Sequence, residues 1–108
     1  DAIYTGSKAP LRPLHEAVLK KIAAFGEFEQ APKKAWVSLR RSKQFAMVGP
    51  GTKGRLEIGL NLRGVTPTER LVAMPEGSMC QCKVWLTDAK EIDKELLGWL
   101  RAAFDAAG

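Results

Sequence analysis

The chain has 108 residues, of which 45% are apolar and 27% charged, and this composition fits one globular domain and excludes an intrinsically disordered chain. It contains neither a secretory signal pattern nor an apolar run near the roughly 20 residues of a membrane-spanning helix, so we expect no membrane partner. Two cysteines are too few for a secreted disulfide framework, which favours the cytoplasm. The net charge of +5 is uneven, with +6 in residues 1–54 and −1 in residues 55–108.

The chain is expected to start with a tether, residues 1–9, and to continue as a single α+β domain, residues 10–108. Apolar residues then recur at spacings of four, four and three, which places them on one stripe of a helix over residues 11–25. These residues are Leu14, Val18, Ile22 and Phe25. Gly26 follows them as a C-terminal cap.

Four segments show the pattern of β-strands, with short links between the first three that fit antiparallel neighbours. The predicted strands cover residues 35–40, 44–48, 55–62 and 79–86. Alternation is cleanest in the third strand, where Leu56, Ile58 and Leu60 share one face. In the second strand, either Phe45 and Met47 or Ala46 and Val48 point into the core. Residues 63–78 hold two prolines and two glycines, which predicts a long loop.

A second amphipathic helix is predicted over residues 89–106, with Asp88 as its N-cap and Glu91 completing a capping box. Its apolar stripe begins at Ile92 and ends at Ala103. Two apolar helix stripes need a sheet face to cover. The predicted fold class is therefore α+β, in the order α-β-β-β-β-α, with a four-stranded antiparallel sheet and both helices packed on one face.

Three stretches, residues 36–46 (Trp-Val-Ser-Leu-Arg-Arg-Ser-Lys-Gln-Phe-Ala), 60–64 (Leu-Asn-Leu-Arg-Gly) and 84–88 (Val-Trp-Leu-Thr-Asp), carry a family resemblance. Together they resemble a bacterial family known as domain of unknown function 5655, over nearly the whole chain. The resemblance implies the α-β-β-β-β-α order and a position C-terminal to a small helical domain, which would then be a partner within the same protein. It implies no catalytic residues.

The residues that most often perform catalysis or bind metals are sparse. Cys80 and Cys82 form a C-x-C pair on one face of the fourth predicted strand, and we expect both to be reduced, metal-free and at least partly buried. His15 is the only histidine, so the chain lacks a zinc ligand set, and we expect this side chain to pack beside the first helix stripe. We therefore expect no cofactor and no metal, and an enzyme is the least favoured of the function classes.

A basic cluster flanks the first three predicted strands and is the candidate anion or nucleic-acid patch. It consists of Lys33, Lys34, Arg40, Arg41, Lys43 and Lys53, with Arg55 beside it. In a meander the turn at 41–43 lies at one end of the sheet and the other lysines at the opposite end. The alternative to nucleic-acid binding is a solvated sheet edge that its charges protect from aggregation.

The candidate binding face is the sheet surface that the helices leave uncovered. Its proposed members are Trp36, Arg40, Arg55, Lys83 and Trp85. Large aromatic side chains flanked by charge are typical of interaction surfaces. The sequence therefore favours a non-catalytic binding or interaction module, with a homodimer or the preceding domain as partner. The alternative is a nucleic-acid-associated domain, in which nucleic acid binds weakly to the basic hairpin and the aromatic face.

Overall fold

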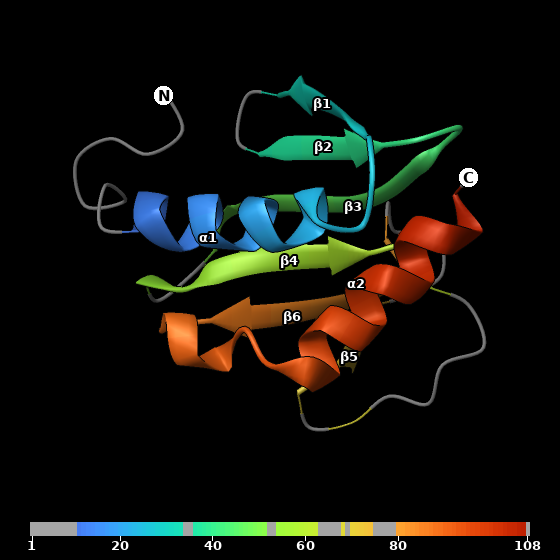
Figure 1. Ribbon diagram of the computed structural model, residues 1–108. Helices are drawn as coiled ribbons and strands as arrows, with labels where there is room; N and C mark the ends of the chain where they lie inside the picture. Colours follow the sequence, from blue (N-terminus) through green and yellow to red (C-terminus); the bar gives the residue numbers. More distant parts are fainter. Residues whose placement is uncertain are drawn as a thin grey trace.

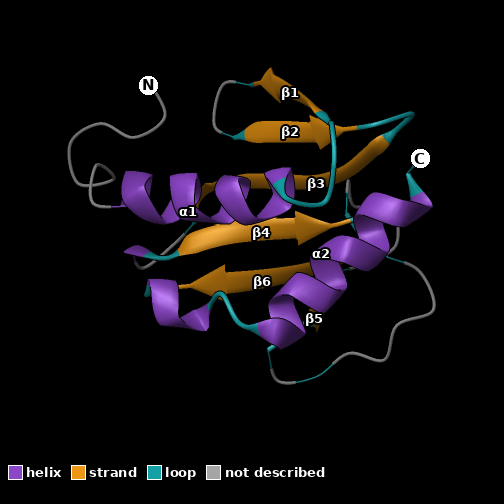
Figure 2. Cartoon of the chain, viewed as in Figure 1, coloured by secondary structure: helices purple, strands orange, loops and turns teal. Residues whose placement is uncertain are grey.

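The structure is a computed structural model in which two helices pack against one face of a six-stranded antiparallel sheet (Figures 1 and 2). It describes residues 11–33, 36–51, 54–62, 68, 70–74 and 80–107. The predicted tether, residues 1–9, lies outside the described residues. No helix within the described ranges is long and apolar enough to cross a membrane.

The sheet has the order β1-β2-β3-β4-β6-β5, and every neighbouring pair of strands is antiparallel. The strands are β1 (Glu29–Pro32), β2 (Val37–Arg40), β3 (Gln44–Pro50), β4 (Leu56–Leu60), β5 (Val72–Ala73) and β6 (Cys82–Leu86). The four central strands correspond to the four predicted ones.

The predicted number of strands is wrong, because β1 and β5 add one strand at each edge of the sheet. β1 is four residues long and ends in Pro32, and its three other residues include a glutamate and a glutamine. Proline and polar residues are typical of edge strands, and they hide the alternation that identifies a buried strand. β5 has only two residues and lies inside the segment predicted as a long loop.

The helices are α1 (Arg12–Ala23) and α2 (Lys94–Ala106). The single helix predicted over residues 89–106 is divided, because a 3-10 turn, η3 (Ala89–Glu91), precedes α2. Asp88 and Glu91 form the expected capping box, but this box closes η3. Asp93 is the N-cap of α2, since its Oδ1 accepts a hydrogen bond from the Leu96 backbone nitrogen at 3.0 Å.

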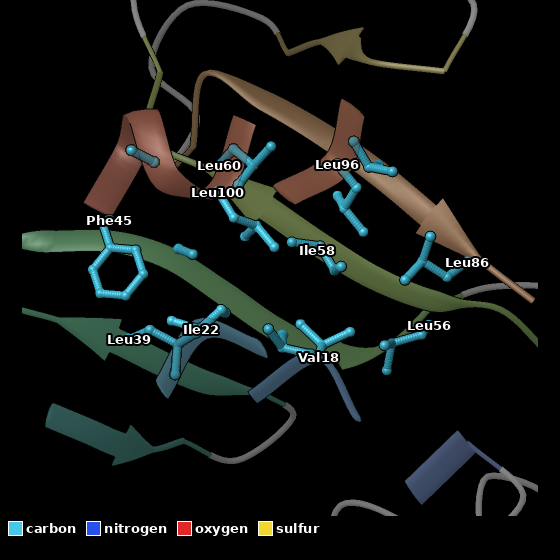
Figure 3. Close-up of a cluster of buried hydrophobic side chains, with 14 of the residues drawn as sticks. Val18, Ile22, Leu39, Phe45, Leu56, Ile58, Leu60, Leu86, Leu96 and Leu100 are labelled. Atoms are coloured by element: carbon cyan, nitrogen blue, oxygen red, sulfur yellow. The ribbon is translucent and has the colours of Figure 1, made fainter. Parts of the chain in front are cut away.

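One hydrophobic core lies between the two helices and the sheet (Figure 3). Val18 and Ile22 of α1 and Leu96 and Leu100 of α2 are fully buried against aliphatic side chains of the central strands. Those strand residues include Leu39, Val48, Leu56, Ile58, Leu60, Val84 and Leu86. Each buried Leu or Ile contributes on the order of 1.5–3 kcal/mol of transfer free energy, which explains why both helices share this face.

A register shift between Leu39 and Arg40 decides which residues of β3 point into the core. The bulge turns Phe45 toward α2, where its ring lies 5.4 Å from the ring of Phe104, centroid to centroid. Ala46 and Val48 are buried in the same cluster, whereas Met47 is only half-buried. The core therefore takes members from both predicted alternatives for this strand.

Candidate functional site

The side of the sheet opposite the helices, here called the outer face, contains the residues that alternate with the core side chains. Cross-strand pairs place them in two rows: Gly49, Glu57 and Trp85 in one, and Ser38, Met47, Gly59 and Lys83 in the other. Because residues on one face of a strand alternate with residues on the other, this surface follows from the burial of Val48, Ile58 and Val84.

Four residues on this surface form the Trp85 cluster, defined as Arg55, Glu57, Lys83 and Trp85. The indole Nε1 of Trp85 donates to Glu57 Oε1 at 3.1 Å, and Glu57 Oε2 pairs with Lys83 Nζ at 3.1 Å. The guanidinium carbon of Arg55 lies 5.0 Å from the centroid of the Trp85 ring, within range of a cation–π interaction. The cluster therefore holds a half-buried indole in one orientation, with Arg55 near its ring and Lys83 bound to the carboxylate that accepts its hydrogen bond.

Trp36 lies on the same side of the sheet but away from this cluster. It is the residue before β2. Because Val37 pairs with Val48 in antiparallel strands, extending the same register by one residue places Trp36 opposite Gly49. Three strand spacings of about 4.8 Å then separate Trp36 from Trp85, roughly 14 Å in all. The indole Nε1 of Trp36 is buried and has no hydrogen-bond partner among the described residues.

Two arginines of the β2–β3 hairpin lie at the opposite end of the sheet. Arg40 is exposed and lines an open groove with Gly26, Phe28 and Glu29. Arg41 is half-buried because its guanidinium contacts the last turn of α2: Nη1 donates to the Phe104 carbonyl at 2.9 Å. Of the five residues proposed for the binding face, the structure thus brings together Arg55, Lys83 and Trp85.

The described members of the basic cluster divide between the two ends of the sheet, as the meander predicts. Lys33 and Arg55 lie near one end, and Arg40, Arg41 and Lys43 at the other, separated by the length of β3. Seven residues of strand span about 20 Å. Lys34 and Lys53 lie outside the described residues.

A chain of polar side chains, absent from the sequence-based hypotheses, crosses the hairpin end of the outer face. Ser38 Oγ donates to Gln44 Oε1 at 2.8 Å, and Gln44 Nε2 donates to Asn61 Oδ1 at 3.2 Å. The Cys80 thiol closes the chain, with its sulfur 3.6 Å from Asn61 Oδ1 and 3.9 Å from Gln44 Nε2. Ser38 and Cys80 are buried, which favours a fully hydrogen-bonded arrangement here.

The family of the chain is established by comparing its sequence with models of known protein families. The family described as "Domain of unknown function (DUF5655)" matches residues 1–107, essentially the whole sequence. The chain belongs to this family. No curated protein and no solved structure matches the chain.

The two cysteines of this DUF5655 domain are both buried and free, but they lie on opposite sides of the sheet. Cys82 belongs to the helix-facing core, whereas Cys80 lies over Gly59, where an added Cβ would be 2.7 Å from the sulfur. The expectation that both thiols share one face is therefore wrong, because β6 is regular only from Cys82 onward. Burial raises the pKa of Cys80 to about 11, so this thiol stays protonated at neutral pH.

Among the described residues of the DUF5655 domain, the structure shows neither a group of metal ligands nor an exposed histidine. Within the described ranges, no three His, Cys, Asp or Glu side chains are grouped so that they could hold a metal ion. His15 is buried on α1, as expected from its place beside the apolar stripe, and desolvation lowers its pKa. It lies among core residues and is no candidate for a catalytic base on the outer face.

Sequence analysis also missed Arg70, which connects the segment before β5 to the start of α2 in this DUF5655 domain. Its Nη1 lies 2.9 Å from Asp93 Oδ1 and 3.2 Å from Glu95 Oε1, and its Nη2 donates to the Glu91 carbonyl. The same guanidinium lies 5.8 Å from the centroid of the Trp99 ring. Arg70 was overlooked because the segment around it is predicted as loop, and we assign it a structural role.

Proposed function

We propose that this DUF5655 domain is a non-catalytic interaction module that binds a protein partner through the Trp85 cluster. The single observation that supports the proposal is the half-exposed indole of Trp85, which is held by its hydrogen bond to Glu57 with Arg55 near its ring and Lys83 on the same carboxylate. Tryptophan and arginine are the residues that most often dominate the energy of protein interfaces. A fixed aromatic side chain also loses little conformational entropy when a partner covers it.

The charge of the cluster favours a partner with carboxylate groups. Arg55 and Lys83 carry two positive charges against the one negative charge of Glu57, and both oxygens of that carboxylate are already in contact with Trp85 and Lys83. Two copies of this surface facing each other would bring like charges together. An acidic protein surface therefore suits the cluster better than a second copy of the domain.

We place this activity in the cytoplasm, where two free thiols in one small domain remain reduced. The helical domain that the family resemblance implies is one candidate for this partner. A homodimer through the outer face is the other protein-based arrangement, and the experiment below separates it from a heterologous partner.

Nucleic-acid binding is the second candidate function, and the exposed side chains of Arg40 and Lys43 are the observation that favours it. Arg41 contributes less than expected, because its guanidinium already contacts Phe104. If the hairpin binds duplex DNA, its binding constant falls with salt concentration, with a characteristic slope on a log–log plot. Arg40→Glu combined with Lys43→Glu should reduce the magnitude of that slope by about 0.9 for each phosphate contact that is lost. An affinity and salt slope unchanged by this double substitution would exclude the hairpin as the site.

The main proposal is tested by titrating the domain with a glutamate-rich peptide at physiological ionic strength, with a glutamine-rich peptide as the neutral comparison. We expect Trp85→Ala to weaken binding by at least about tenfold. Arg55→Gln combined with Lys83→Gln should weaken it about three- to tenfold. The matched control, Lys20→Gln with Lys21→Gln, removes the same charge from an exposed part of α1 and should change affinity by less than about twofold.

Equal losses in the double variant and its control would contradict the proposal, because the peptide would then respond only to net charge. Sedimentation of the domain alone gives the second result. A dimer that Trp85→Ala dissociates would identify a second copy as the partner.

A further inference from the structure

A pocket at the hairpin end of the sheet, separate from the Trp85 cluster, has the features of a small-ligand site. It encloses about 370 Å³ beneath the last turn of α2, where β3 begins, β4 ends and β6 begins. Its polar lining consists of Lys43, Gln44, Asn61 and Gln81, and its apolar lining is Leu62 with three alanines of α2 and the C-cap residue Ala107. A concave, mostly apolar surface with a few convergent polar groups is the usual form of a ligand site.

The carboxamide side chains of this pocket come from three adjacent strands or their ends. The pairs Ala46 with Leu60 and Leu60 with Cys82 form the last regular row of the sheet, and the three carboxamides follow just beyond this row. Gln44 and Asn61 are fixed by hydrogen bonds to each other and to the buried Ser38 and Cys80. These bonds use both polar atoms of Gln44 and the oxygen of Asn61, so the two amides form a rigid wall beside Gln81, and a rigid wall is a property of preorganised sites.

The electrostatic environment of the pocket admits an anion. Among the described lining residues, Lys43 carries the only charge. The C-terminal carbonyls of α2 would otherwise make this end negative. Two of them are occupied, because Phe104 O accepts from Arg41 and Ala107 O accepts from the Ser42 backbone nitrogen at 2.8 Å.

We propose that this pocket binds a carboxylate that carries a neighbouring amide group. The carboxylate would contact Lys43 at the mouth, the amide would hydrogen-bond to the carboxamide of Gln81, and a small side chain would rest on Ala103 and Leu62. Carboxamides match both the donor and the acceptor of a secondary amide. A phosphate fits less well, since one lysine faces it, and a nucleobase would lack an aromatic stacking partner among the described lining residues.

This chemistry occurs both in N-acyl amino acids and at the C-terminus of a peptide chain. The experiment therefore has three ligands: N-acetyl-alanine, a short alanine-rich peptide with a free carboxylate, and the same peptide with an amidated C-terminus. Binding is followed through the side-chain amide signals of Gln44, Asn61 and Gln81 in heteronuclear NMR spectra. Binding of only the small acid identifies a metabolite site, and tighter binding of the free peptide identifies a C-terminus site.

The amidated peptide should bind at least about tenfold more weakly than the free acid, because it cannot form the ion pair with Lys43. Lys43→Gln should reproduce that loss for the free acid, whereas Lys20→Gln on α1 should not. Gln81→Ala changes a half-exposed side chain and should also weaken binding in a folded protein. The proposal is overturned if millimolar concentrations of both acids leave the three amide signals unchanged. Equal affinity for the amidated peptide would also overturn it.

Discussion

Arg41 and Phe104, 63 residues apart in the sequence, are joined by two contacts of one guanidinium group. Arg41 Nη1 donates to the Phe104 carbonyl at 2.9 Å, and its guanidinium carbon lies 4.1 Å from the centroid of the Phe104 ring. The carbonyl belongs to the last turn of α2, where unpaired acceptors and the helix dipole favour a cation. The hairpin arginine thus caps the C-terminal helix.

We expect Arg41→Ala to lower the free energy of unfolding by about 1–2 kcal/mol, because it removes a charge-assisted hydrogen bond and a cation–π contact from a half-buried position. Arg40→Ala removes an exposed arginine from the adjacent position and should cost less than about 0.5 kcal/mol. Chemical denaturation monitored by circular dichroism measures both. Equal effects of the two substitutions would mean that the Phe104 contacts add nothing to stability.

Gly59 and Gly98 provide a matched pair of glycine-to-alanine substitutions with opposite expected signs. A Cβ at position 59 would lie 2.7 Å from both Cys80 Sγ and Met47 Cγ, so Gly59→Ala should destabilise the fold by about 1–3 kcal/mol. Gly98 is exposed within α2 and has open space where an added Cβ would lie, so Gly98→Ala should stabilise by about 0.5–1 kcal/mol. A stabilising Gly59→Ala substitution would contradict the packing of Cys80 on the outer face.

The Cys80 thiol predicts a loss of stability in alkaline solution. Its pKa is raised to about 11 in the folded state, while an unfolded thiol titrates near 8.5. Between these values the unfolded chain loses its proton first, so the free energy of unfolding falls as pH rises, by at most about 1.4 kcal/mol per pH unit. Denaturation at a series of pH values, compared with Cys80→Ala, isolates this contribution, and identical slopes for the two proteins would refute it.

His15 predicts the opposite pH dependence. Burial lowers the pKa of His15 below the ordinary value of 6.5. As the pH falls through 6.5, the imidazole therefore becomes protonated in the unfolded chain while it is still neutral in the folded chain. The stability of the protein should therefore decrease from neutral pH into the window below 6.5, and His15→Leu should remove this dependence. Since this is the only histidine, its NMR titration reports the folded pKa directly, and a value above 6.5 would contradict the burial argument.

The central strands and the helix stripes could be predicted because alternation and helical spacing report burial directly. Leu56, Ile58 and Leu60 show this, since all three are fully buried on the face they were assigned to. β1 and β5 could not be predicted, because an edge strand needs no alternating apolar residues and Pro32 argues against strand on local grounds. No local pattern indicated the bulge at Leu39 and Arg40, which turns Phe45 into the core.

The candidate site was predictable where it depends on alternation along single strands, as for Trp85, Lys83 and Arg55. Local sequence could not show that Glu57 would join Trp85 to Lys83, since that depends on the register between β4 and β6. The polar chain from Ser38 to Cys80 was missed for the same reason. Its members come from the regions of β2, β3, β4 and β6, and among them only Ser38 and Gln44 share one short stretch of sequence.

The central claim is that the Trp85 cluster is the binding surface, and indole N–H signals test it most directly. Trp85 lies on the outer face, whereas Trp99 packs against the helix side with Arg70 near its ring, so Trp99 serves as an internal reference in the same spectrum. We predict that the glutamate-rich peptide shifts the Trp85 indole signal in a saturable manner and leaves the Trp99 signal in place. A saturable shift of Trp99 without one of Trp85 would contradict the account.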